Sequence, residues 1–251
     1  MGIFSGPRIT GNYDAFVVIL QLDQATVASM LPPEIALMPQ TLTPPGRHPV
    51  MMSFNIQKNV RLEWGWLKGP RFNYLEFAAG VPFTQLAKPR GPFRGPFFFA
   101  PLLFLNNWIA ILMGLFWGFA KHDAWMKENA SCFTIGQASQ NLVEAAFQAT
   151  GDWGKISDFP YAQGIPAMLE QTGIGKTVLG PLLTIPLSQD LSSAQVQPVD
   201  ADVHILQAFL QGLPAGEYKL QALNQAPLGA YRMKAQWWLG MPQLPSSIKP
   251  S

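Results

Sequence analysis

The sequence predicts one mainly β domain, an antiparallel barrel or double sheet with a few short helices. Short runs of β-branched, aromatic and alternating apolar residues recur along the 251-residue chain, and clusters of glycine and proline separate them. No internal repeat, long linker or shift in composition interrupts this pattern, so residues 1–251 are expected to form a single domain. A chain of this length can bury a substantial core.

The composition indicates a dense core together with an apolar pocket. Charged residues make up 13% of the chain, about half the usual share of a soluble domain, whereas there are 17 Phe and 8 Trp. Low charge combined with many aromatic residues argues against disorder. The net charge is +2 and the basic residues are scattered, so no nucleic-acid partner is expected.

The expected compartment is the cytoplasm. A single cysteine, Cys132, excludes an internal disulfide framework and is typical of a reducing environment. The start of the chain, MGIFSGPRIT, lacks the apolar core of a secretory signal.

The first half of the chain combines strand patterns with one short helix. Strands are predicted at residues 16–22, 50–56, 64–66 and 74–81. The alternation in residues 50–56 is that of a half-buried strand. Asp23 is a candidate N-cap for a helix that runs to Met30. The segments 41–49 and 88–96 have the glycine and proline content of loops.

The second half repeats the strand patterns. Residues 133–148 predict a strand, a polar turn and a second strand. Residues 177–187 are apolar but carry two prolines, so an edge or irregular strand is expected there. Residues 201–210 fit a strand at their start and a helix later, whereas residues 228–239 alternate as a strand does.

One uncharged stretch, residues 97–120, is long enough to span a bilayer. Pro101 and the polar pair Asn106 and Asn107 argue against spanning, and they divide the stretch into two short apolar runs. Buried strands and segments that line an apolar cavity have the same composition. We therefore expect no membrane span, while contact with a membrane surface stays open.

Familiar nucleotide and metal patterns are incomplete. Residues 172–177, TGIGKT, resemble a phosphate loop, but Glu170 stands where its first glycine belongs, so a glycine-rich turn is expected. His48, His122 and His204 have no metal-ligand spacing, and no metal is expected. The serine nucleophile motif G-x-S-x-G is absent from the sequence.

Lys121 and Glu76 are charged residues with apolar surroundings. Lys121 follows the uncharged stretch, so burial would disfavour its ammonium form, lower its pKa and leave an amine able to attack a ketone. The alternative is a lysine whose stem is buried and whose charge reaches solvent. Glu76 fits a general acid or base, an ion-pair partner for a lysine, or the solvent face of an edge strand.

Taken together, these segments resemble the acetoacetate decarboxylase family over nearly the whole chain. The matching segments, in the order of the family's motifs, are Leu31-Pro32-Pro33-Glu34; Tyr74-Leu75-Glu76 with Pro82; Leu105-Asn106-Asn107 with Ala110, Ile111 and Gly114; Trp117-Gly118-Phe119-Ala120-Lys121-His122; and residues 230–239. The segment that ends in Lys121 and His122 is similar to the family's aromatic-Pro-Lys-Lys signature after a one-residue deletion. The resemblance implies the fold of that family.

The resemblance also implies that Lys121 forms a Schiff base with a carbonyl substrate and that Glu76 is the acid or base. His122 would tune the amine. Substrate-binding roles are expected for nearby motif residues, namely Tyr74, Trp117, Phe119 and His122. The expected activity is that of a lyase acting on a β-keto acid or a larger apolar carbonyl compound. No cofactor is expected. The chain is expected to form a homo-oligomer.

Two alternative functions are also consistent with the same resemblance. One is a Schiff-base aldolase, dehydratase or cyclase, and the other is a relative that carries an apolar ligand without turnover. The family's Gly-Arg-Glu segment reads Gly114-Leu115-Phe116, and its first-strand arginine falls near Tyr13, so a small carboxylate loses its obvious anchor. Either Arg61, Arg71 or another residue binds the substrate carboxylate in place of the missing arginine, or the substrate is larger and more apolar.

Overall fold

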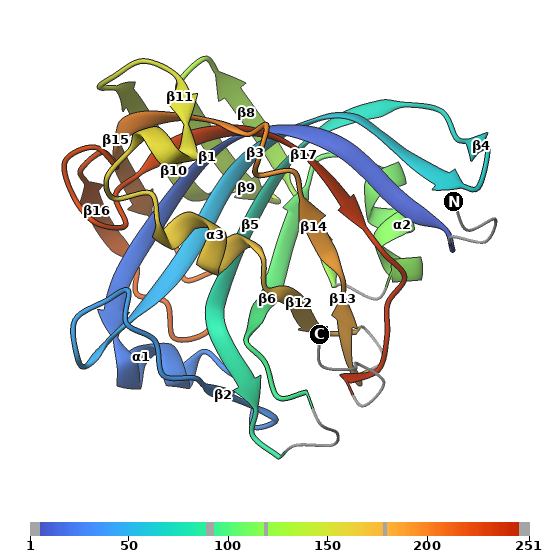
Figure 1. Cartoon of the computed structure of the whole chain (residues 1–251), viewed down its shortest axis with the longest axis horizontal. Coiled ribbons are helices and arrows are strands. Elements are labelled where there is room, and N and C mark those ends of the chain that lie inside the picture. Colours follow the sequence, from blue (N-terminus) through green and yellow to red (C-terminus); the bar gives the residue numbers. More distant parts are fainter. Residues whose placement is uncertain (1–5, 89–92, 118–119, 178–179, 246–251) are drawn as a thin grey trace.

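Five neighbouring strands form the main sheet, and the three longest of them have 15 to 18 residues and are strongly curved (Figure 1). In spatial order they are β17 (Tyr231–Leu239), β1 (Arg8–Asp23), β3 (Arg47–Trp64), β5 (Phe72–Leu86) and β6 (Phe97–Leu105). Every neighbouring pair in this set is antiparallel. The computed structural model describes residues 6–88, 93–117, 120–177 and 180–245.

A second group of strands packs on one face of the main sheet. It contains β8 (Trp125–Asn129), β9 (Cys132–Gln137), β10 (Gln140–Ala149), β15 (Gln195–Ile205) and β16 (Gly216–Leu220). The first residues of β15 pair with β17 and its later residues pair with β10, so this strand passes from one sheet to the other. The predicted mainly β class with a few short helices is therefore confirmed.

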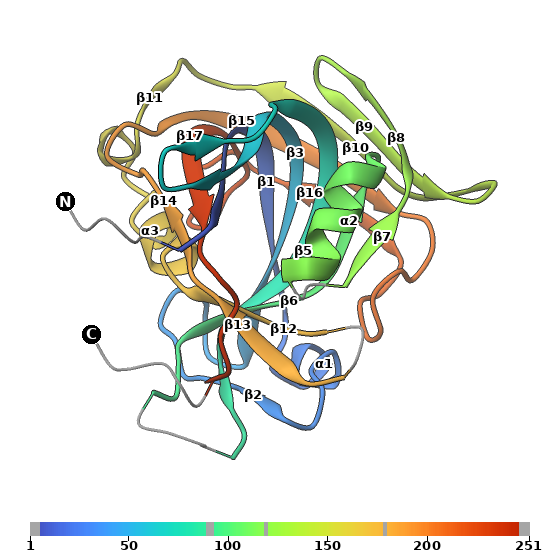
Figure 2. The same cartoon turned by 90° about the vertical axis from the view of Figure 1, so that its right-hand side faces the viewer.

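Shorter elements cover the other face and the edges. The strands are β2 (Ile35–Leu37), β4 (Leu67–Lys68), β7 (Lys121–Asp123), β11 (Gly154–Lys155), β12 (Thr172–Lys176), β13 (Leu182–Ile185) and β14 (Leu187–Gln189). The helices are α1 (Gln24–Ser29), α2 (Trp108–Trp117), the 3-10 helix η1 (Ile156–Asp158) and α3 (Gly164–Leu169). Figure 2 shows α2 lying beside β7.

The alternation of side chains along the long strands explains why the main sheet is buried on both faces. In β1, Phe16 and Val18 point into the core between the two sheets, where Phe16 stacks on Phe147. The intervening Val17 points the other way and belongs to a second apolar cluster, which includes Ile165 of α3. Each long strand therefore contributes side chains to an apolar core on one side and to a second apolar layer on the other.

Most predicted strands are present, and several are longer than predicted. The predicted helix after Asp23 is α1, but the Asp23 side chain makes no capping hydrogen bond and instead pairs with Arg47 at 3.3 Å. Residues 64–66, predicted as a strand, form a hairpin tip between β3 and β4 with Gly65 at a φ of +59°. A left-handed residue closes this turn, which is why the local apolar pattern misled the prediction.

Two other predictions are corrected, and one segment whose secondary structure was left open is a helix. Residues 172–177, predicted as a turn, begin with strand β12, which pairs with β6 and β13. Residues 50–56 are buried on both faces rather than half-buried, because α3 and β14 cover the second face. The second half of the uncharged stretch is helix α2, whose first turn begins with backbone N–H groups of Ile109 and Ala110 bonded to the Asn107 side chain. Within the described ranges, no helix has the length and apolarity needed to cross a membrane.

Candidate active site

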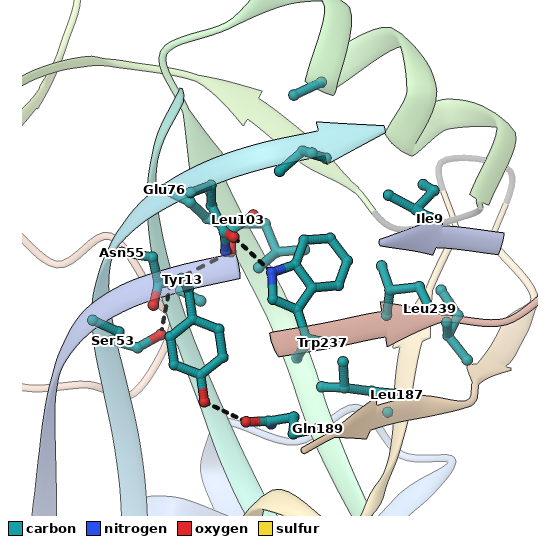
Figure 3. Close-up of a pocket in the computed structure, with 18 of the residues that line it drawn as sticks. Ile9, Tyr13, Ser53, Asn55, Glu76, Leu103, Leu187, Gln189, Trp237 and Leu239 are labelled. Atoms are coloured by element: carbon teal, nitrogen blue, oxygen red, sulfur yellow. Dashed lines mark hydrogen bonds between the residues drawn. The ribbon is translucent and has the colours of Figure 1, made fainter. Parts of the chain in front are cut away.

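A cavity of about 180 Å³ lies on the face of the main sheet that points away from the second sheet. Its floor is the set of side chains that alternate with the core, including Tyr13 of β1, Ser53 of β3 and Leu103 of β6. Figure 3 shows these side chains around the cavity together with Trp237 of β17 and Leu187 of β14. The walls are mainly aliphatic and aromatic, as is usual for sites that bind small apolar molecules.

Lys121 enters this cavity from β7. The strand pairs in parallel with β6, so that Lys121 stands opposite Leu103, which also lines the cavity, and His122 stands opposite Phe104, which lies in the core. Helix α2 lies directly over the lysine stem. A Cβ on Gly114 would come within 2.1 Å of the Lys121 Cδ, so the glycine is needed for this close approach.

The amine of Lys121 is poorly solvated. Its Nζ donates a hydrogen bond of 3.4 Å to the carbonyl oxygen of Ala110 in α2. Burial lowers the pKa of Lys121 from its usual value, and the negative charge of Glu76 opposes this shift. The predicted desolvation of the lysine is therefore present, and the ammonium form is disfavoured.

Glu76 lies on β5 and faces the same cavity. Its Oε1 accepts hydrogen bonds from Gln57 Nε2 at 3.2 Å and from Asn55 Nδ2 at 3.4 Å. Gln57 in turn accepts a hydrogen bond of 2.9 Å from the indole Nε1 of Trp237, which fixes the orientation of its amide. Burial raises the pKa of Glu76, while the charge of Lys121 and the two amide donors oppose the rise.

The two groups form an electrostatically coupled acid–base pair. Burial favours the uncharged form of both, and the charge of each favours the charged form of the other. Loss of a proton from the ammonium group of Lys121 yields a nucleophilic amine, and the carboxyl group of Glu76 can then give or take a proton on the same side of the sheet. This arrangement suits chemistry in which an amine adds to a carbonyl carbon.

Tyrosines line the polar parts of the remaining wall. Tyr74 lies beside Glu76 on the same strand face, and burial followed by the charge of Glu76 raises its pKa well above the usual value. Farther along, the Tyr13 hydroxyl donates to Oε1 of Gln189 (Figure 3). The cavity thus has a polar end at Glu76 and a second polar spot at Tyr13.

The predicted site residues fall into three groups. Lys121, Glu76 and Tyr74 lie at one cavity, as predicted, while their chemical roles stay predictions. His122 is exposed and its ring lies 5.8 Å from that of Phe104, because neighbouring residues of a strand point to opposite sides. Its position does not fit the predicted contact with substrate.

Trp117 is also displaced from its predicted role. It is buried at the end of α2, and its indole Nε1 donates a hydrogen bond of 2.8 Å to the carbonyl oxygen of Gly240. It therefore anchors the helix to the chain that follows β17 and does not line the cavity. Phe119, the remaining predicted residue, lies outside the described residues.

Neither predicted substitute for the missing family arginine reaches the cavity. The Nη2 of Arg61 lies 2.6 Å from Oε1 of Glu63, and the Nη2 of Arg8 lies 2.9 Å from Oε2 of the same carboxylate. Arg71 borders the same polar surface hollow as these residues. Arg8, Arg61 and Arg71 thus gather at this surface hollow, outside the apolar cavity.

Sequence reasoning missed Asn55, Gln57, Trp237 and Gly114 as parts of the site. The two amides alternate with apolar residues of β3, a pattern that also describes an ordinary solvent-facing strand surface. The glycine interrupts a helix otherwise made of large apolar residues, and an isolated glycine there is a signal of close approach. Among the described residues, no group of three or more His, Cys, Asp or Glu could hold a metal ion.

Comparisons with solved structures define the class of fold as acetoacetate decarboxylase-like, in agreement with the sequence resemblance. No family model matches the sequence, and no curated protein does. The likeness is therefore one of structure.

Several solved structures match over nearly the whole chain. The enduracididine biosynthesis enzyme MppR, complexed with pyruvate, has a TM-score of 0.63 and 12% identity, covering 98% of this chain and 93% of that one. An acetoacetate decarboxylase-like enzyme from Sphingomonas wittichii RW1 has a TM-score of 0.59 and 11% identity, with 96% and 94% covered. Acetoacetate decarboxylase itself has a TM-score of 0.58 and 11% identity, with 96% and 89% covered. These values establish the shared fold.

Proposed function

We propose that this chain is a Schiff-base-forming lyase in which Lys121 condenses with a carbonyl substrate. The observation that carries the proposal is the meeting of a desolvated amine and a buried carboxyl group at one apolar cavity. The structural relatives support the proposal, since MppR forms a complex with the condensation product of pyruvate and imidazole 4-carboxaldehyde.

The chemistry begins with the uncharged amine of Lys121. Its lone pair adds to the carbonyl carbon, and the oxygen leaves as water after it has taken up protons, which Glu76 is placed to deliver. The resulting iminium ion accepts electrons from the adjacent carbon–carbon or carbon–hydrogen bond. A bond between the α-carbon and one of its substituents can then break, and its electrons form an enamine. Protonation of the α-carbon restores the iminium ion, which water hydrolyses to free the enzyme.

Helix α2 supports this chemistry by excluding water. It covers the lysine stem at Gly114 and supplies the carbonyl oxygen of Ala110 to the amine. The hydrogen-bonded row from Trp237 through Gln57 to Glu76 holds the carboxyl group toward the cavity. Positioning of both reactive groups on packed strands favours a reactive geometry before substrate arrives.

Borohydride trapping tests the proposal. The enzyme is incubated with a small ketone and sodium borohydride, and peptide mass spectrometry locates the reduced adduct. We expect the adduct on Lys121 and its loss in Lys121→Ala, whereas Lys127→Ala, which alters an exposed lysine on β8, retains it. Absence of an adduct from Lys121 would rule out the proposal.

The same variants separate catalysis from simple ligand binding. The cavity is largely apolar, which also suits a protein that carries an apolar ligand without turning it over. That function requires ligand affinity to be unchanged in Lys121→Ala and Glu76→Gln. We expect instead that the ketone loses its slow-dissociating, covalent component when Lys121 is replaced.

A further inference from the structure

Charge in the cavity is balanced before any substrate enters. Among the described residues that line it, Lys121 is the only cation and Glu76 is the only anion. Once the lysine has become an iminium ion, its positive charge still faces the carboxylate. A carboxylate on the substrate would therefore be a second anion without a cation of its own.

Nearby arginines do not supply that cation. Arg232 is bound to Asp14 through two hydrogen bonds, with Nε to Oδ1 at 2.6 Å and Nη2 to Oδ2 at 2.9 Å. Arg8 and Arg61 both bind Glu63 outside the cavity. Because burying an unpaired carboxylate is strongly unfavourable, the engagement of these arginines with other carboxylates disfavours a keto acid as substrate.

Protonation of Glu76 does not remove the conflict. If the carboxyl group took up a proton to relieve repulsion between like charges, it could no longer remove a proton from the substrate. Its hydrogen bonds from Gln57 and Asn55 are made by amide donors, which suit a carboxylate acceptor. The site therefore keeps its base only when the substrate brings no negative charge.

The size and lining of the cavity define the rest of the substrate. A dry cavity of about 150 Å³ lined by aliphatic and aromatic side chains binds benzene. The cavity here is about 180 Å³, and Val60, Ile185 and Leu239 are among its walls. A carbonyl compound with one ring or one branched alkyl group, on the order of six to eight heavy atoms, fits this space.

We propose, resting on the imine-forming function above, that the substrate is an uncharged apolar ketone or aldehyde and that Glu76 removes a proton from its α-carbon. After Lys121 and the carbonyl carbon have formed the iminium ion, the α-carbon–hydrogen bond breaks and its proton moves to the Glu76 carboxylate. The bonding electrons form the carbon–carbon double bond of an enamine and neutralise the nitrogen. Return of a proton and hydrolysis regenerate the ketone, so exchange with solvent needs only water.

A matched pair of ligands tests this substrate class. Methyl isobutyl ketone and acetoacetate have the same branched shape, with an isopropyl group in the ketone where the acid has its carboxylate. Both are incubated at equal concentration with the native protein and borohydride, and adducts are quantified on the Lys121 peptide. We expect the ketone to be trapped at least tenfold faster. An adduct from acetoacetate counts whether it retains the acid or carries the acetone left by decarboxylation.

Each result decides a different claim. Equal or faster trapping of acetoacetate overturns the neutral-substrate inference and leaves the imine function standing. No adduct from either compound overturns both. Trapping of the ketone alone supports both.

Deuterium exchange tests the role of Glu76. In deuterium oxide, proton NMR is expected to show loss of the α-proton signals of methyl isobutyl ketone with the native protein. We expect Glu76→Gln to slow this exchange at least a hundredfold while the Lys121 adduct still forms. Undiminished exchange in Glu76→Gln overturns the assignment of the base.

A gain of charge provides the complementary test. Gln189 lines the cavity near Tyr13, away from the Lys121 and Glu76 pair. Gln189→Lys is expected to raise trapping of acetoacetate at least tenfold relative to Gln189→Met, which has similar length and no charge. If the added cation leaves acetoacetate trapping unchanged, missing charge is not what excludes the acid, and the inference fails.

Discussion

Gly114→Ala is expected to displace the amine of Lys121 without unfolding the protein. The new Cβ would lie 2.1 Å from the Lys121 Cδ and 2.5 Å from its Cε. Because carbon atoms pack at about 3.5 Å or more, the lysine stem has to retreat by roughly 1.5 Å. A misplacement of about 1 Å can cost on the order of a hundredfold in rate, so we expect borohydride trapping to slow by about that factor.

Stability is expected to change little in the same variant. Alanine in the middle of a helix is favoured over glycine by about 1 kcal/mol, and this gain offsets the cost of moving the flexible lysine stem. The net change in the free energy of unfolding should stay within about 1 kcal/mol, as measured by urea titration.

Gly151→Ala is the matched control for this prediction. Its added Cβ would meet no atom closer than 3.5 Å, so trapping should proceed at the native rate. Native trapping in Gly114→Ala as well would refute the conclusion that α2 positions the lysine.

Two further variants test the pair and its support. Glu76→Gln removes the charge that raises the pKa of Lys121, so the amine should become neutral at lower pH. The midpoint of the trapping rate against pH should move down, and an upward or absent shift contradicts the coupling. Trp237→Phe leaves Gln57 without its buried donor, at a cost of about 1–3 kcal/mol in urea unfolding. The partly exposed Trp238→Phe should cost less than about 0.5 kcal/mol, and equal losses would refute the role of the indole.

Sequence patterns predicted the strands well because the alternation of side chains is a local property. The segment 74–81 lies within β5, and the segment 228–239 contains β17. The local pattern could not predict that the second face of the main sheet is also covered. Val17 shares an apolar cluster with Ile165 of α3, far along the chain, and sequence spacing does not reveal that the two segments pack together.

The candidate site was predictable only in part for the same reason. Lys121 and Glu76 were recognisable as charges in apolar surroundings, and motif order related them to a family. The amides of Asn55 and Gln57 gave no such signal, because polar residues that alternate along a strand also occur on solvent-facing sheets. Their role depends on the elements that close over them.

Helix α2 was the least predictable element. Its residues are apolar all round, and Trp108 and Leu115 keep 71% and 51% of their surface exposed. A helix of this kind has no polar face whose spacing would reveal it. Its start depends on the Asn107 side chain, which accepts hydrogen bonds from the first turn.

The parallel pairing of β6 and β7 makes the nature of the reactive group depend on chain length as well as on residue type. Removal of one residue just before β7, with the pairing otherwise kept, would place the imidazole of His122 opposite Leu103 and turn the amine of Lys121 away from the cavity. The amine would thereby be exchanged for an imidazole ring without any substitution. A change in the length of this short connection thus replaces the chemistry itself.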